Sequence, residues 1–360
     1  MESSMLPTLR QKQPGRLAKQ LPKGVRPVIV TWGNDGIPAQ IQFSDGMSSP
    51  GSCIRCVNPP CMEYTASELE LSVFRDFPAD RNESVCPPGA ITWPQEEDSP
   101  LIDSEICISC GLCVSRCPTR AIYLDGNGAH INDLPNRHFQ VQNFPATKES
   151  TEVITALFNR LSERGIYRAE TDTILDGFLK HFVQVAADQG AQFPNHLARN
   201  LLIACGIGAA MRRRGDTNIR MDMVLGPPGV ASGTGEVEFG AGVLDAPRNI
   251  LDNVAVLVAR YEIAKDHIVP LIVSLSLPNQ RSEYWQVIKD IRSVLGVSIN
   301  SITLGALVVL VWNRKKIVIE TGEELYIDAD SPSLRPILER ILGRRVNVVM
   351  GYPGFLESIK

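Results

Sequence analysis

Residues 107–118 read CISCGLCVSRCP, and this stretch contains four of the nine cysteines in the 360-residue chain. The spacing is C-x2-C-x2-C-x3-C, with the thiols at Cys107, Cys110, Cys113 and Cys117. Thiolates this close in sequence approach one metal centre from a single tight loop. Gly111 lets the backbone come near the centre, and Pro118 turns the chain away after the last cysteine. The stretch therefore predicts a loop folded around a metal cofactor.

Four more cysteines lie upstream, so that eight of the nine fall within residues 53–117. These four are Cys53, Cys56, Cys61 and Cys86. The N-terminus shows no apolar core of a secretory signal, and clustered cysteines without such a signal indicate metal binding in a reducing compartment and not disulfides. We therefore expect a cytoplasmic location. A zinc site is the alternative, because CxxC pairs also bind zinc.

Over about residues 27–135 the chain resembles a two-cluster bacterial-type ferredoxin. The resemblance implies two 4Fe-4S clusters with interleaved ligands, since the fourth cysteine of each run serves the other cluster. On that pattern one cluster takes Cys53, Cys56, Cys61 and Cys117, and the other takes Cys107, Cys110, Cys113 and Cys86. The first set departs from the family by a four-residue gap before Cys61 and a 24-residue insertion before Cys86. Hairpins are expected over residues 28–43 and 121–132.

A complete oxidoreductase would need a second cofactor site. Gly206 and Gly208 lack the third glycine of a dinucleotide-binding loop, and we recognise no flavin or molybdenum signature. A ferredoxin-like fold does not by itself decide whether its clusters transfer electrons, sense redox state or support the structure.

From Lys148 onward, apolar residues follow helical and strand spacing in turn. The predicted helices span residues 151–163, 171–188, 196–204, 246–264 and 283–295. The predicted strands span residues 207–213, 219–225, 236–241, 268–277 and 301–312. The order from about residue 192 is α-β-β-β-α-β, which is typical of a mixed α/β sheet fold.

Residues 221–239, MDMVLGPPGVASGTGEVEF, combine a glycine-rich turn with three acids, Asp222, Glu236 and Glu238. A phosphate-binding loop would need a lysine where Glu236 stands, and a carboxylate there would repel a triphosphate. Glu236 and Glu238 share one face of a strand, and a hairpin would place Asp222 across from them. Three converging carboxylates suit Mg2+. The alternative is that all three acids simply face water.

The element order and these acids resemble the restriction-endonuclease-like superfamily, the PD-(D/E)xK nucleases, over about residues 192–315. In that family the second strand carries an aspartate and the third carries E-x-K. Here Glu238 replaces the lysine, as in the E-x-E variants of some restriction enzymes. The resemblance implies that Asp222, Glu236 and Glu238 are both catalytic and Mg2+-binding. Arg220 is a candidate cation on the same face.

The sequence thus predicts a multidomain α+β and α/β protein in which a ferredoxin-like dicluster domain and an αβββαβ restriction-endonuclease-like core fold separately. The predicted parts are a basic tail (1–26), a ferredoxin-like 4Fe-4S domain (27–147), a helical linker (148–191) and a nuclease-like domain (192–360). The tail carries six Lys and Arg residues against one Glu, and such tails are mostly solvated.

The predicted function is metal-dependent hydrolysis of nucleic-acid phosphodiesters, in restriction or defence, with clusters that are structural or redox-sensing. One alternative is a ferredoxin-type electron-transfer protein whose C-terminal part docks a partner without catalysis. Another is a redox-controlled binding module. The expected partners are nucleic acid, with DNA favoured, a redox partner protein and a second copy in a homodimer. No membrane association is expected, because no apolar run reaches 18 residues.

Overall fold

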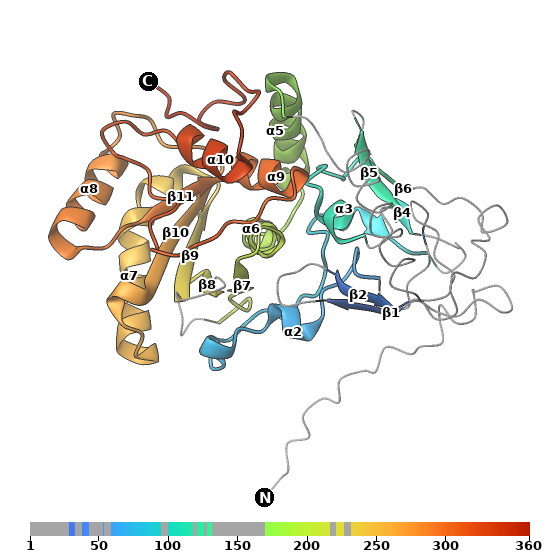
Figure 1. The fold of residues 1–360 in the computed structure, drawn as a ribbon, viewed down its shortest axis with the longest axis horizontal. Helices are drawn as coiled ribbons and strands as arrows, with labels where there is room; N and C mark the ends of the chain where they lie inside the picture. Colours follow the sequence, from blue (N-terminus) through green and yellow to red (C-terminus); the bar gives the residue numbers. More distant parts are fainter. Residues whose placement is uncertain are drawn as a thin grey trace, which may run out of the picture.

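The structure is a computed structural model, and it describes residues 29–32, 38–42, 53, 59–94, 100–117, 121–125, 128–131, 170–216, 221–226 and 232–360. The predicted basic tail, the predicted helix over residues 151–163 and Arg220 lie outside these ranges. Figure 1 shows a central sheet with helices on both sides and the cysteine-rich region packed beside it. No helix in the described ranges is long and apolar enough to cross a bilayer.

The central sheet has five strands in the order β11-β10-β9-β8-β7. Their bounds are β7 Gly208–Met211, β8 Met223–Gly226, β9 Ser232–Glu238, β10 Ile268–Ser274 and β11 Asn300–Thr303. Strands β7, β8 and β9 form an antiparallel meander. Strand β10 then pairs in parallel with both β9 and β11. The sheet is therefore mixed, with its change from antiparallel to parallel pairing at β9.

Helices cover both faces of this sheet, and the periodicity predicts the positions of those named here except α9 (Leu304–Trp312). Helix α6 (Phe193–Ala204) packs on β7 and β9, and α7 (Ala246–Tyr261) packs on β9 and β10. In Figure 1, α7 and α8 (Glu283–Leu295) lie on one side of the sheet, and α6 and α9 lie on the other. From α6 to β10 the observed order is α-β-β-β-α-β, as the sequence predicts.

Close packing within the sheet explains a glycine in β9. A Cβ on Gly235 would lie 2.5 Å from Cγ of Met223 in β8 and 2.9 Å from its sulfur. The large Met223 side chain, which is fully buried, therefore fills the space above Gly235. The glycines of residues 232–238 thus serve strand packing, which agrees with the rejection of a phosphate-binding loop.

The predicted strand over residues 301–312 is wrong. Strand β11 ends at Thr303, and residues Leu304–Trp312 form helix α9. The Thr303 side chain accepts a hydrogen bond from the backbone N–H of Ala306 and so caps the helix. All nine residues of α9 are buried. A helix that is apolar on every side has no helical periodicity, so its sequence looks the same as that of a buried strand.

Other helices agree with or extend the predictions. Helix α5 (Asp172–Ala187) begins after Thr171, whose side chain accepts a hydrogen bond from the backbone N–H of Ile174. Helix α10 (Arg335–Leu342) near the C-terminus was not predicted. Three single 3-10 turns are Ser72–Phe74, Ala241–Leu244 and Lys265–His267.

The cysteine-rich region consists of short elements. Both predicted hairpins are present, as β1 (Ile29–Trp32) with β2 (Pro38–Gln42) and β5 (Ile122–Asp125) with β6 (Gly128–Ile131). The further elements are β3 (Ile91–Thr92), β4 (Leu101–Ile102), α2 (Ala66–Leu69) and α3 (Leu112–Arg116). Helix α3 packs against α6 and α9.

One hydrophobic core joins the two regions. Buried residues from both, such as Leu112 and Val114 of α3 and Leu201 and Val311 of the C-terminal part, belong to a single cluster. In the described residues, the two predicted domains therefore share a hydrophobic core, and whether they fold separately stays a prediction. The physical reason is that a small cysteine-rich region has too little apolar surface to bury by itself, and helices α6 and α9 supply the rest.

Candidate functional site

Four thiols come together where the second 4Fe-4S cluster is predicted. Cys107 and Cys110 lie in the loop before α3, Cys113 lies in its first turn, and Cys86 follows the segment of residues 82–85. Burial raises the pKa of Cys113 well above its ordinary value, and the neighbouring Cys86, Cys110 and Cys107 raise it further. Burial also raises the pKa of Cys110, and the neighbouring Cys86 raises it further. These thiols therefore lie within electrostatic reach of one another.

Backbone donors already point at two of the cysteine sulfurs. The N–H of Ala90 donates to Sγ of Cys86, and the N–H of Ala121 donates to Sγ of Cys117, each at 3.2 Å. Hydrogen bonds to sulfur help to set the reduction potential of an iron–sulfur cluster. The donor set thus fits a cluster ligated by thiolates.

The first predicted ligand set is only partly described. Cys53, Cys61 and Cys117 pack against the same core as the second set, while Cys56 lies outside the described residues. Cys61 lies close enough to Cys113 to contribute to its raised pKa. The two sets are therefore neighbours, and the complete first set remains a prediction.

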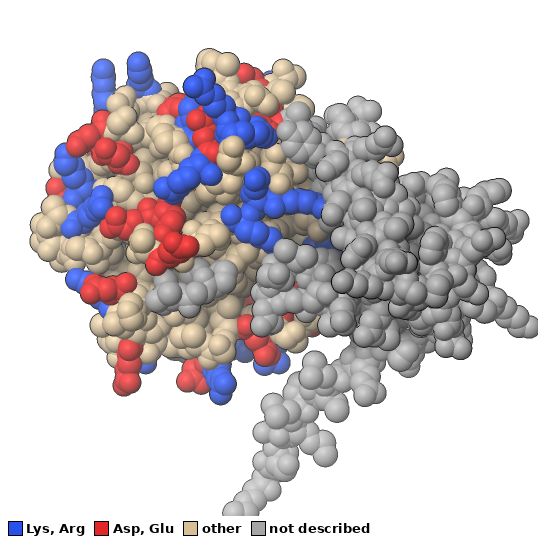
Figure 2. Space-filling model, in the orientation of Figure 1, with Lys and Arg blue, Asp and Glu red and all other residues tan. Residues whose placement is uncertain are grey.

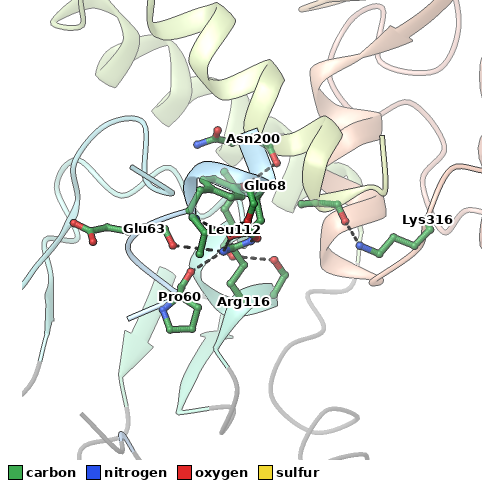
Figure 3. Close-up of polar contacts among 12 residues, drawn as sticks. Pro60, Glu63, Glu68, Leu112, Arg116, Asn200 and Lys316 are labelled. Carbon is green, nitrogen blue, oxygen red and sulfur yellow. Dashed lines mark hydrogen bonds and ion pairs between the residues drawn. The ribbon is translucent and has the colours of Figure 1, made fainter. Parts of the chain in front are cut away.

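Arg116, which the sequence analysis did not single out, joins helix α3 to the segment of residues 60–68 (Figure 3). It lies in α3 between Cys113 and Cys117 and is only 4% exposed. Its Nε donates to the carbonyl oxygen of Pro60 at 2.7 Å, next to Cys61, and its guanidinium pairs with Glu68 at 2.8 Å. It also lies 4.1 Å above the ring of Tyr64. The place of Arg116 within the cysteine run was the signal that could have identified it as a structural residue.

Helix α6 is bonded to the segment that leads to Cys86. Nδ2 of Asn200 donates to the carbonyl oxygens of Ser84 at 2.9 Å and Val85 at 3.1 Å. Nη2 of Arg199 donates to the carbonyl oxygen of Asn82 at 2.7 Å. Both side chains are fully buried. The polar residues of α6 therefore fix the position of the segment that presents Cys86.

The three predicted acids gather at one end of strands β8 and β9. Asp222 comes directly before β8, and not on it as predicted, whereas Glu236 and Glu238 lie in β9. Met223 pairs with Gly235, so Asp222 stands across from Glu236 in the antiparallel register. Oδ2 of Asp222 accepts a hydrogen bond from the N–H of Val237 at 3.3 Å. Asp222 and Glu236 therefore face each other across β8 and β9.

Their electrostatics are those of a crowded acidic site. Burial, followed by the Asp222 carboxylate, raises the pKa of Glu236 to about 7. The same two causes raise the pKa of Glu238. Glu236 is 8% exposed and accepts hydrogen bonds from Nδ2 of Asn253 at 3.1 Å and Nδ2 of Asn249 at 3.4 Å. Neutral amides thus orient Glu236 without neutralising it.

A cation stands beside this site, although it is not the predicted Arg220. Nη2 of Arg212, at the end of β7, lies 4.0 Å from Oδ1 of Asp222. Burial raises the pKa of Asp222, while the N–H of Val237, the side chain of Asn195 and Arg212 lower it. Asn195 belongs to the first turn of α6.

Neither the thiols nor the acids are already arranged around a single ion. Among the described residues, no group of three or more His, Cys, Asp or Glu side chains could hold a metal ion as it stands. For the thiols this agrees with a cluster of four irons, which is larger than one ion. For the acids, side chains of like charge repel one another and would have to turn toward a shared cation.

An apolar pocket opens at the same end of β9 and β10. Three aromatic rings contribute to its lining, from Phe182 of α5, Phe193 of α6 and Phe239, the residue after Glu238. Phe182 contacts the other two rings at centroid distances of 6.0 and 5.8 Å. On the face shown in Figure 2, Lys and Arg side chains are interspersed with Asp and Glu, and the described part of that face carries no continuous basic patch.

Comparison with known proteins supports the cysteine region. Residues 100–123 match the family model of the 4Fe-4S binding domain. An uncharacterized ferredoxin of Methanocaldococcus jannaschii is 29% identical over 92 residues, which are 26% of this chain and 44% of that protein. A ferredoxin of Pyrobaculum islandicum is 61% identical over 28 residues, 8% of this chain and 26% of that protein.

A third relative is the uncharacterized ferredoxin-like protein YdhY of Escherichia coli, which is 33% identical over 76 residues, 21% of this chain and 26% of that protein. The chain therefore spans less than half the length of these relatives. No solved structure matches the chain. The chain contains a ferredoxin-type 4Fe-4S binding region, and the match to the family model ends before the central sheet.

Proposed function

We propose that this protein binds two 4Fe-4S clusters and hydrolyses nucleic-acid phosphodiesters at Asp222, Glu236 and Glu238 with Mg2+. The observation that carries the hydrolytic part is the meeting of these three carboxylates at one end of β8 and β9, where burial raises the pKa of all three and the Asp222 carboxylate raises the pKa of both glutamates further. Acids with perturbed pKa values that lie close together are typical of functional sites, because such an arrangement does not stabilise the folded state.

The topology around the acids supports a restriction-endonuclease-like core. A helix, an antiparallel three-stranded meander, a second helix and a strand parallel to the third follow one another from α6 to β10. The aspartate stands at the second strand of the meander and the E-x-E pair stands on the third. This is the order that the superfamily uses to bring its acids together.

Each residue of the site has a part in this proposal. Asp222 and Glu236 would hold Mg2+, and Asn249 and Asn253 would orient the Glu236 carboxylate. A bound Mg2+ would supply an activated water and neutralise charge at the scissile phosphate. Arg212 would offer its guanidinium to a phosphate oxygen beside Asp222. The partly exposed ring of Phe239 suits contact with a planar base, since bases stack on aromatic side chains, whereas the rings of Phe182 and Phe193 are buried against each other.

The second candidate is a ferredoxin-type electron-transfer protein, in which the C-terminal part docks a redox partner. The specific observation in its favour is that the matched relatives are described as ferredoxins or ferredoxin-like. In that case the acids of β9 would have no catalytic part, and the clusters alone would carry the function.

A cleavage assay separates the two. The protein is purified without oxygen and incubated with plasmid DNA or RNA in the presence of Mg2+ or Mn2+. We expect cleavage by the wild type and none by Asp222→Ala or Glu236→Ala. Asp252→Ala is the matched control, because Asp252 is an exposed acid of α7 that is not among the residues of the site. Absence of cleavage in both oxidised and reduced protein, with Mn2+ binding unaffected by Asp222→Ala, would favour electron transfer.

A further inference from the structure

Helix α6 touches both candidate sites, and it is the described element that joins them. At its first turn, the Asn195 side chain hydrogen-bonds Asp222. One to two turns further along, Arg199 and Asn200 bond the carbonyl oxygens of Asn82, Ser84 and Val85. A single helix of 12 residues therefore spans the distance between the acids and the segment that ends at Cys86.

The contacts on the cluster side are buried and specific. His196 is 6% exposed, and its Nε2 donates to the carbonyl oxygen of Ser84 at 3.0 Å. The hydroxyl of Tyr64 donates to the backbone oxygen of Asn200 at 3.4 Å (Figure 3). Nε of Arg199 donates to Oδ1 of Asn200 at 2.9 Å, which fixes the orientation of that amide. Buried polar groups need such partners, and losing them has a large energetic cost.

The contact on the acid side has a defined chemical effect. The Asn195 side chain hydrogen-bonds the Asp222 carboxylate, and because a carboxylate accepts, the amide N–H of Asn195 is the donor. Asp222 also stands across from Glu236. Residues that hydrogen-bond a metal-ligating carboxylate orient it, and their loss typically weakens metal affinity 10- to 100-fold.

We propose that α6 couples the two sites: Asn195 positions the Asp222 carboxylate, Arg199 and Asn200 fix α6 to the segment that ends at Cys86, and the acidic site binds divalent cations fully only when the Cys86 cluster is in place. This inference rests on the proposed function, because it concerns the cation site of that reaction. Asn195 is a positioning residue and not a catalytic one. The cluster acts through protein contacts, and no electron has to move.

The physical basis is that metal–ligand energy is also folding energy in small cysteine-rich regions. Without the cluster, Cys86 no longer anchors residues 82–85, and the amide of Asn200 and the guanidinium of Arg199 lose fixed acceptors. Helix α6 is then held by its apolar face alone, and Asn195 at its first turn no longer keeps Asp222 in place.

Mn2+ binding to the full chain tests the coupling, with free Mn2+ measured by paramagnetic resonance. We expect the cluster-free protein, Asn195→Ala and Asn200→Ala to bind Mn2+ about tenfold or more weakly than the cluster-loaded wild type. Asn195→Ala should keep the absorbance of its clusters. A general loss of structure would instead reduce that absorbance. Asn300→Ala is the matched control, since Asn300 is also a buried asparagine that donates to carbonyl oxygens, here of Pro270 and Gly322.

Hydrogen exchange gives a second readout that needs no cation. The N–H of Val237 donates to Asp222, so its exchange reports directly on the position of that carboxylate. We expect faster exchange at Val237 in the cluster-free protein and in Asn200→Ala. Unchanged exchange there, or an equal loss of Mn2+ affinity in Asn300→Ala, overturns the coupling. If the wild type binds no Mn2+ while exchange at Val237 still follows cluster loading, the positioning of Asp222 through α6 stands, but its effect on cation binding and the proposed hydrolytic function both fail.

Discussion

Trp312 and Ser109 lie 203 residues apart in sequence, and Nε1 of Trp312 donates a hydrogen bond to the carbonyl oxygen of Ser109 at 3.0 Å. Ser109 stands between two cysteines of the predicted cluster loop, and Trp312 ends the buried helix α9. The same tryptophan contacts Phe178 of α5, with ring centroids 6.2 Å apart. The cluster loop is therefore held from outside, by a residue of the C-terminal part.

Gly111 is predicted to be intolerant of a side chain because of this contact. Its φ is +82°, and a Cβ there would lie 3.0 Å from Cδ1 of Trp312. Gly111→Ala should therefore lower both the stability of the protein and its iron content. Gly343→Ala is the matched control, because Gly343 has a φ of +73° with nothing near its Cβ position. The control should cost about 1–2 kcal/mol from the backbone conformation alone and keep its iron. Equal effects of the two changes in thermal melts would show that the Trp312 contact is unimportant.

Iron content is predicted to follow the two cysteine sets. The full chain should hold about eight irons in two 4Fe-4S clusters. Cys86→Ser and Cys107→Ser should each remove about four of them, since both thiols belong to the described set. Cys205→Ser is the control: Cys205 is a fully buried thiol that lies outside both ligand sets and contacts the carbonyl oxygen of Leu307. Anaerobic iron and sulfide analysis measures this, and zinc in place of iron would contradict it.

The C-terminal part is predicted to fold poorly without the cysteine-rich region. Helix α3 packs on α6 and α9, and these surfaces form part of one core. A fragment that begins at residue 148 exposes that apolar surface and leaves Arg199 and Asn200 without their acceptors. We expect a lower melting temperature and aggregation relative to the full chain, measured by calorimetry. A cooperative transition at the temperature of the full chain would mean that the shared core contributes little.

The sequence predicted most elements of the central sheet, because amphipathic helices such as α8 and uniformly apolar strands such as β10 leave clear patterns. It predicted the meeting of Asp222 with Glu236, because strand alternation and a hairpin determine which side chains face each other. It could not predict α9, whose residues are buried on every side. It could not predict the contacts of Arg116, Asn195 and Asn200 either. Their partners are backbone carbonyls or residues distant in sequence, and neither leaves a local pattern.

His196 is predicted to make the protein acid-sensitive. Burial, followed by repulsion from Arg199, lowers its pKa to about 4, from about 6.5 in the unfolded chain. The folded state therefore favours the neutral ring, so stability is complete above about pH 6.5 and falls as the pH drops toward 4. Each pKa unit is worth about 1.4 kcal/mol, so the loss approaches about 3 kcal/mol. Denaturant titrations should show a smaller loss in His196→Gln than in the wild type. His181→Gln, a change at a partly exposed histidine of α5, is the matched control.

Glu238→Lys introduces the lysine of the E-x-K pattern, and on the proposed function we predict that this variant keeps Mn2+ binding and cleavage. Glu238 is the least buried of the three acids, and part of the rise in its pKa comes from Asp245, outside the site. Among the causes that raise the pKa of Glu236, Asp222 ranks above Glu238. Asp222 and Glu236 therefore form the closer pair and the better cation site.

A lysine at 238 would remove repulsion and lower the pKa of Glu236. Cleavage should then persist to lower pH than in the wild type. Loss of Mn2+ binding in Glu238→Lys, to the level of Asp222→Ala, would instead identify Glu238 as a metal ligand.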